Sequence, residues 1–212
     1  MNVGFLSTQI ATLGVTSATF VLSLVLALAM TLKARKSQQS SQFFWAIGLW
    51  IFAATVLIEI AFAAGFYSGI AEKAYLALVA LLVEVLALGS MQLVKSKALR
   101  FSYYAFFVLS TGYLFYGTAA SAIGNLLSNY IMSGVPPLAV TVGSALVTVP
   151  ATIILIAISA ISFARTKRKK MLSIIAGVAL VAVAGTLYIA QFPSLLYIAE
   201  FVGILLLWIG FS

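Results

Sequence analysis

The sequence predicts an all-α, polytopic membrane protein: a bundle of seven transmembrane helices with its N-terminus outside the cell and its C-terminus in the cytoplasm. Three observations predict this fold. The 212 residues are 64% hydrophobic and only 8% charged, with a mean hydropathy of +1.18, whereas soluble domains carry about 25% charged residues. The apolar residues form seven long stretches, and the basic residues gather in alternate breaks. We therefore expect a multi-pass protein of the cell membrane, with lipid as its main partner.

The length of each apolar stretch supports a membrane span. A bilayer core about 30 Å thick is crossed by about 20 helical residues, each rising about 1.5 Å. The stretches are residues 10–32, 43–66, 74–94, 101–127, 137–164, 171–192 and 195–211, the last being the shortest. The first has no basic segment before it and is too long for a cleavable signal, so we expect a retained helix. The breaks are too short for another domain, and residues 1–212 are expected to form a single transmembrane domain.

The basic residues orient these helices. The break after the first stretch holds Lys33, Arg35 and Lys36, the break after the third holds Lys95, Lys97 and Arg100, and the break after the fifth holds Arg165, Lys167, Arg168, Lys169 and Lys170. Of the 12 basic residues only Lys73 lies on the other side. Because cytoplasmic loops retain positive charge, these three breaks face the cytoplasm.

The run from Arg165 to Lys170 has two interpretations. It is either a stop signal that orients the fifth helix or a surface for anionic lipid or an acidic partner protein. Since the positive charges mark topology, the net charge of +8 does not indicate a nucleic-acid partner. The longest outer segment, residues 125–137, either caps the outer mouth of the bundle or only connects two helices.

The composition excludes several kinds of chemistry. The chain has no Cys and no His, and all four of its acidic residues are glutamates, so it has no Asp either. Thiol chemistry, disulfides, His-ligated haem, zinc sites and the most common general base are therefore excluded. We expect no catalytic residues, no metal site and no cofactor, and the chain is not expected to be an enzyme.

Three glutamates lie within the predicted spans: Glu59, Glu84 and Glu200. An ionisable group inside a membrane costs several kcal/mol unless it is paired or hydrated, which makes each one a functional candidate. At about 1.5 Å per residue, Glu84 falls near the midplane and the other two roughly 4 to 8 Å towards the outside. The three could therefore share one site. Glu72, beside Lys73 at the outer boundary, is expected to be an ordinary surface residue.

Other polar side chains fall in the same outer half and extend this candidate site for a substrate or proton. They are Tyr113, Tyr116, Tyr188, Gln191 and Tyr197. The alternative is that these side chains form the aromatic belt of a membrane protein while each glutamate, protonated, bonds to a neighbour.

Some segments resemble known families. Residues Trp45-Ala46-Ile47-Gly48-Leu49, with Glu59, Gly65 and Leu88-Gly89 beyond them, resemble uncharacterised seven-helix membrane proteins of bacteria and archaea. The layout is similar to that of microbial rhodopsins, but the last helix carries Glu200 and no retinal-binding Lys. It is also similar to SWEET-type transporters, whose 3 + 1 + 3 repeat would put Glu84 and Glu200 on corresponding helices, but the Pro-Gln motif of that family is absent. These likenesses of layout carry no activity over.

The sequence leads to two hypotheses of function. The first is a transporter or channel for a proton, a cation or a small solute that uses the intramembrane glutamates. The second is a non-catalytic sensor or an accessory subunit of a larger membrane complex, which would meet its partner, or further copies of itself, in the membrane or at the basic loops.

Overall fold

The chain is all-helical apart from a minimal β-hairpin. The computed structural model describes residues 3–124, 126–128, 131–132, 134–167, 170, 172–177, 179–181 and 193–211. The helices are α1 (Val3–Ser37), α2 (Ser40–Ala63), α3 (Gly69–Met91), α4 (Lys97–Ala120), α5 (Leu138–Thr166) and α7 (Pro193–Phe211), and the strands are β1 (Leu127–Ser128) and β2 (Ile131–Met132). A shorter apolar helix, Leu172–Val181, precedes α7. The predicted fold class, an all-α chain of seven helical segments, is confirmed.

Several helices begin or end at other residues than predicted, each for its own local reason. α1 begins at Val3 instead of residue 10, and Gln9 near its start donates a hydrogen bond of 2.9 Å to the carbonyl of Ala63, at the end of α2. α2 ends at Ala63, shortly before Gly65, whose φ of 89° favours glycine. α4 ends at Ala120 instead of residue 127 because Ser121 is extended. Of the predicted segment 171–192, residues 182–192 lie outside the described residues.

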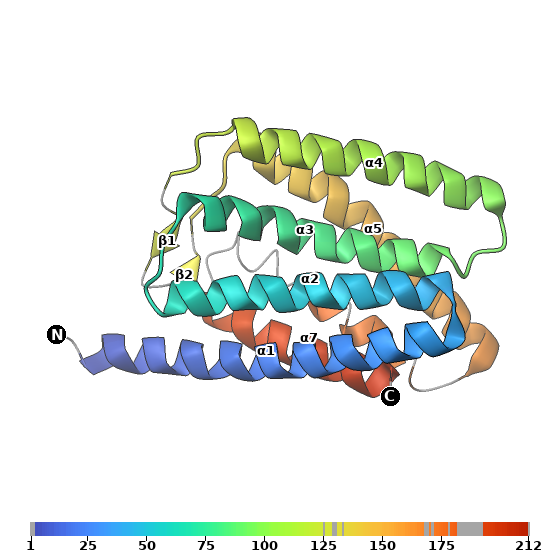
Figure 1. The fold of residues 1–212 in the computed structure, drawn as a ribbon, viewed down its shortest axis with the longest axis horizontal. Helices are drawn as coiled ribbons and strands as arrows, with labels where there is room; N and C mark the ends of the chain where they lie inside the picture. Colours follow the sequence, from blue (N-terminus) through green and yellow to red (C-terminus); the bar gives the residue numbers. More distant parts are fainter. Residues whose placement is uncertain are drawn as a thin grey trace.

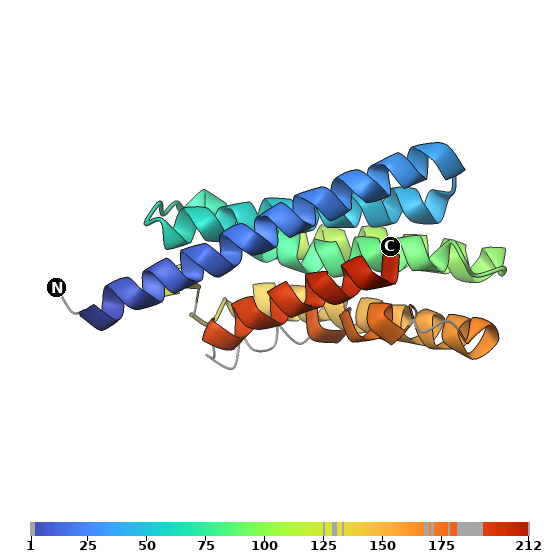
Figure 2. The same cartoon turned by 90° about the horizontal axis from the view of Figure 1, so that it is seen from below.

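The helices run along the long axis of the molecule (Figures 1 and 2). In Figure 1, α1 to α4 follow one another in chain order from bottom to top, and α5 and α7 lie behind them. α3 is central, since it contacts α2, α4 and α5, whereas α7 contacts α1. The two termini lie towards opposite ends of the molecule.

The two ends of the bundle differ in charge. The end where α1 and α5 finish and α4 begins carries the described basic residues Lys33, Arg35, Lys36, Lys95, Lys97, Arg100, Arg165, Lys167 and Lys170. We call it the basic end. The opposite end carries β1 and β2, which pair through Leu127 with Met132 and Ser128 with Ile131, and we call it the hairpin end. The charge separation that the sequence predicts is therefore present in three dimensions.

The largest hydrophobic cluster joins six helices, α4 included through Tyr103, in the half nearer the basic end. It includes Met30 of α1, Phe52 of α2, Leu86 of α3, Leu155 of α5 and Leu207 of α7. Close packing of α2 on α3 depends on glycine: a Cβ atom on Gly48 would lie 2.7 Å from the Leu86 side chain, and one on Gly89 would lie 2.3 Å from the Trp45 ring. These contacts set the antiparallel register of α2 and α3, which positions the glutamates described below.

Four of the described helices are long and apolar enough to cross a membrane. They are Thr12–Ser37 within α1, Ser40–Ala63, Gly69–Met91 and Leu138–Arg165 within α5. Their burial differs greatly, since 78% of the apolar window in α3 is buried inside the bundle but only 22% of the one in α5. α3 is thus shielded by its neighbours, and α5 presents an apolar surface to its surroundings.

Candidate functional site

Glu59 occupies a position on α2 where the helix pattern calls for an apolar side chain. Phe52, Val56, Glu59 and Ala63 recur at the spacing of one helical face, and all four are buried. The Glu59 side chain is 2% exposed. Its Oε1 atom accepts a hydrogen bond of 2.7 Å from the hydroxyl of Tyr75 on α3.

Glu200 and Tyr197 of α7 lie beside Glu59 and Tyr75. Both are buried, one helical turn apart. The carboxyl groups of Glu59 and Glu200 lie close enough to interact directly with each other, and Tyr197 interacts electrostatically with both. Because a carboxylate only accepts hydrogen bonds, this contact requires a proton shared by the two groups. We call Glu59, Tyr75, Tyr197 and Glu200 the carboxyl-pair site.

No positive charge neutralises this site within the described part of the chain. Each glutamate interacts with the other, Tyr75 and Tyr197 interact with both, and none of these interactions involves Lys or Arg. The Glu59 Oε2 atom is buried without an N–H or hydroxyl donor. A buried carboxylate without a partner is costly. The Glu59–Glu200 pair therefore needs either a proton or a cation from outside the protein to balance its negative charge.

Glu84 forms a separate site between α3 and α4. It is fully buried, and its two oxygens accept hydrogen bonds from Ser110 (2.5 Å) and Thr111 (2.7 Å). Tyr103 lies near enough to interact with it electrostatically, although the Tyr103 hydroxyl is buried without a hydrogen-bond partner in the described structure. Both oxygens of Glu84 are thus satisfied by neutral donors on a single neighbouring helix.

The expectation that the three glutamates share one site is wrong. In the antiparallel α2–α3 pair, Tyr75 meets Glu59 and Ser90 meets Trp45, so Glu84 is level with Trp50, nine residues from Glu59. At about 1.5 Å per residue this separation is about 13 Å along the helix. The structure brings together two of the three carboxyl groups and leaves Glu84 nearer the basic end.

The other residues predicted for the site divide in the same way. Tyr197 belongs to the carboxyl-pair site, but Tyr113 and Tyr116 of α4 are 43% and 73% exposed, and the Tyr113 ring lies beside Gly143 of α5. Their placement agrees with the alternative of an aromatic belt. Tyr188 and Gln191 lie outside the described residues.

Glu72 is not the surface residue that its position beside Lys73 suggested. It is fully buried and accepts hydrogen bonds from the backbone N–H of Leu126 (2.6 Å) and from the hydroxyl of Tyr67 (2.9 Å). The bond to Glu72 is the main reason why the pKa of the Tyr67 hydroxyl is raised. The described part of the segment between α4 and α5 is thereby held against the start of α3, where it closes the hairpin end.

A stripe of hydroxyl side chains on α1 was missed in the sequence. Thr12, Thr16, Thr19 and Ser23 are all buried, and their spacing of four, three and four residues places them on one face of α1, which packs on α2 and α7. Thr16 donates to the carbonyl of Thr12, Thr19 to that of Val15 and Ser23 to that of Phe20. The Gln9 to Ala63 bond and the Trp50 to Thr31 bond join α1 and α2 on either side of Glu59 and of this stripe. The oxygens of these hydroxyls remain acceptors, which suits a cation.

The basic run after α5 is exposed where it is described. Arg165, Lys167 and Lys170 are exposed, and the Lys167 ammonium lies 5.9 Å from the centre of the Phe163 ring. Arg168 and Lys169 lie outside the described residues. Three described basic side chains thus remain available to solvent or lipid headgroups at this end.

Neither metal ligands nor known relatives assign a role to these residues. The described residues contain no group of three or more acidic, His or Cys side chains that could hold a metal ion. Comparison of the chain with protein-family models, with curated proteins and with solved structures finds no match.

Proposed function

We propose that this chain is an integral membrane protein that exchanges protons for a cation or a small cationic solute at the carboxyl-pair site. The carrying observation is the buried contact of Glu59 with Glu200, which has no compensating Lys or Arg among the described residues. No catalytic role is part of the proposal.

The outer surface of the bundle supports a place in the membrane. Exposed side chains include Phe101 (76%), Leu109 (74%) and Leu138 (79%), and soluble monomers rarely expose contiguous apolar patches of this kind. With four helices of membrane-spanning length already evident, we propose that the remaining helical segments complete seven spans. The basic end then faces the cytoplasm and the hairpin end the exterior.

Charge balance describes how the site would work. With one shared proton, the pair carries a single negative charge that the two carboxyl groups hold between them. When a cation binds, that proton can leave, so that one positive charge replaces another and the buried charge of the site is unchanged. The Tyr75 hydroxyl continues to donate to Glu59 Oε1, and the buried hydroxyl stripe of α1, which packs on α2 and α7, offers further acceptors. Exchange of this kind is how a transporter couples a solute to protons.

Flux measurements test the proposal. The protein is reconstituted into vesicles with a pH gradient and a pH-sensitive dye inside, and Na⁺, K⁺ or guanidinium is added outside. We expect at least one of these cations to collapse the gradient, and both Glu59→Gln and Glu200→Gln to slow that collapse at least tenfold.

Glu84→Gln is the matched control, because it makes the same change at a buried glutamate whose oxygens are satisfied by hydroxyl donors, and it should retain most of the flux. Absence of flux in the wild type, or unchanged flux in both pair variants, would refute the proposal.

A role as an oligomer or an accessory subunit is favoured by one face of α4. Ala105, Gly112 and Ala119 recur every seven residues and are exposed, and a Cβ atom on Gly112 would meet nothing within 4 Å. In lipid, small residues let a second helix approach closely. The exposed Arg165, Lys167 and Lys170 would add contacts with anionic lipid or with an acidic protein.

Cross-linking tests this second candidate cleanly because the chain has no Cys. Gly112→Cys should form a disulfide-linked dimer, or a link to a co-purifying protein, under mild oxidation in the membrane. Ala29→Cys, at an exposed position of α1, serves as the control. Equal cross-linking of the two variants, or none in Gly112→Cys, would argue against a contact through α4.

A further inference from the structure

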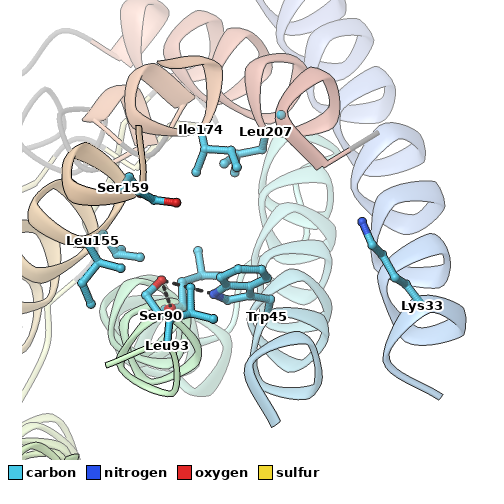
Figure 3. A pocket seen from close by; sticks show the side chains of 12 residues that line it. Lys33, Trp45, Ser90, Leu93, Leu155, Ser159, Ile174 and Leu207 are labelled. Atoms are coloured by element: carbon cyan, nitrogen blue, oxygen red, sulfur yellow. Dashed lines mark hydrogen bonds between the residues drawn. The ribbon is translucent and has the colours of Figure 1, made fainter. Parts of the chain in front are cut away.

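A cavity of about 170 Å³ lies at the basic end, away from both glutamate sites. Its walls come from the ends of α1, α2, α3, α5 and α7 and from the Leu172–Val181 helix. Figure 3 shows Ser159 on one side, Trp45 and Ser90 on another, and Ile174 and Leu207 opposite. Five helices and a sixth segment therefore leave an unfilled space between them at this end.

The walls of the cavity are mainly apolar, with a few polar groups. Leu86, Leu93, Leu155, Ile158, Ile174 and Leu207 supply the apolar part. A dry cavity of about 150 Å³ lined in this way can hold a benzene molecule. The space thus fits an apolar body of about six carbon atoms.

The polar groups are hydroxyls and one ammonium. Ser159 is 9% exposed, and its hydroxyl points into the space in Figure 3. Ser90 accepts a bond of 3.3 Å from the Trp45 indole N–H and donates to Leu86. A hydroxyl that points into such a space can donate to or accept from a polar group of a ligand.

Lys33 determines the charge of that ligand. It is the charged residue among the described residues that line the cavity. It already has an interaction within the protein, but an ammonium has three N–H donors and can bind an anion in addition. The surrounding basic residues of α1, α4 and α5 add a positive field that attracts anions to this end.

We propose that this cavity binds a small amphipathic monocarboxylate, with its carboxylate at Lys33 and its apolar body of about six carbon atoms between Leu155, Ile174 and Leu207. This inference is independent of the proposed exchange at the carboxyl-pair site. It names a second site, for an anion, at the opposite end of the bundle.

Tryptophan fluorescence reports on this cavity directly because Trp45 forms part of its wall. In a variant with Trp50→Phe and Trp208→Phe, Trp45 is the remaining tryptophan, since the chain has three and the other two are replaced. The detergent-solubilised variant is titrated with 6-bromohexanoate, whose bromine would quench Trp45. Two ligands of matched length, neutral 6-bromohexanol and cationic 6-bromohexyltrimethylammonium, serve as controls that need no further mutation.

We expect saturable quenching by the carboxylate and at least about tenfold weaker binding of the alcohol, since the charge-assisted bond to Lys33 is lost. Lys33→Gln should weaken carboxylate binding by a similar factor, and Ser159→Leu, which fills the space, should abolish it. Lys36→Gln, three residues along α1 and exposed, should leave binding unchanged.

Quenching that rises linearly with all three ligands would mean partition into detergent only and would overturn the proposal. Saturable quenching that is equal for the three ligands would overturn the assignment of an anion. Should Lys33→Gln or Ser159→Leu fail to fold, the three ligands tested on the folded parent variant still decide between these outcomes.

Discussion

Two buried glutamate sites in this bundle show opposite solutions to the same problem. Glu84 is held by hydroxyl donors from Ser110 and Thr111 of α4, so its cost of burial is offset by its neighbours. Glu59 meets a second acid, Glu200, and its Oε2 atom has no N–H or hydroxyl donor in the described structure. The difference teaches that burial of a glutamate does not by itself indicate function: the first site is complete, and the second needs a proton or a cation.

Removal of Glu84 should have the largest effect on stability. Glu84→Ala takes away the acceptor of two hydroxyls and leaves a cavity, which we expect to cost about 2 to 3 kcal/mol. Glu200→Ala should cost less than about 1 kcal/mol, because it also removes one of two acids that compete for a proton. Thermal unfolding in detergent, followed by circular dichroism, measures both, and a larger loss for Glu200→Ala would reverse the comparison.

Glu72 should behave like Glu84, since it is also satisfied by donors from the protein. Glu72→Ala leaves the buried Leu126 N–H unpaired, at a cost of about 1 to 3 kcal/mol. Hydrogen exchange at Leu126 should become faster while exchange in α2 is unchanged. Slow exchange at Leu126 in the variant would show that the segment before β1 is held by other contacts.

Tyr75 tests the donor side of the carboxyl-pair site. Tyr75→Phe removes the 2.7 Å bond to Glu59 and should cost about 1 kcal/mol. Tyr113→Phe makes the same change at an exposed residue and should stay within about 0.5 kcal/mol of the wild type. Unfolding of the two variants side by side gives the comparison, and equal stability would mean that the Tyr75 bond contributes nothing net.

Only a small effect on stability is expected for Glu59→Gln. The amide can donate to Glu200 where the shared proton did, so the free energy of unfolding should change by less than about 1 kcal/mol. The infrared band of the protonated carboxyl group should nevertheless disappear from the spectrum of the variant. If that band persists at full strength, the protonated carboxyl group does not belong to the Glu59–Glu200 pair, and the shared proton that we propose is wrong.

Part of the geometry of the candidate site could be predicted from sequence. The residue count along each helix singled out Glu59, Glu84 and Glu200, and the structure places Tyr197 beside two of them, Glu59 and Glu200. The count could not tell which helices are neighbours or which face a side chain takes. α2 and α3 are apolar on nearly every face, so their periodicity does not orient Glu59 or Glu84. Glu72 was misjudged because its partner, the Leu126 N–H, comes from a segment 54 residues away.

The sequence by itself determined the helical class, the apolar segments and the gathering of basic residues at one end. These are local properties, set by composition and by the order of residues along single helices. Tertiary structure alone decided that Glu59 meets Glu200, that Glu84 stands apart with Ser110 and Thr111, and that a cavity lies beside Lys33. The physical reason is that these contacts depend on helix neighbours and on rotation about each helix axis, which packing of the whole bundle sets.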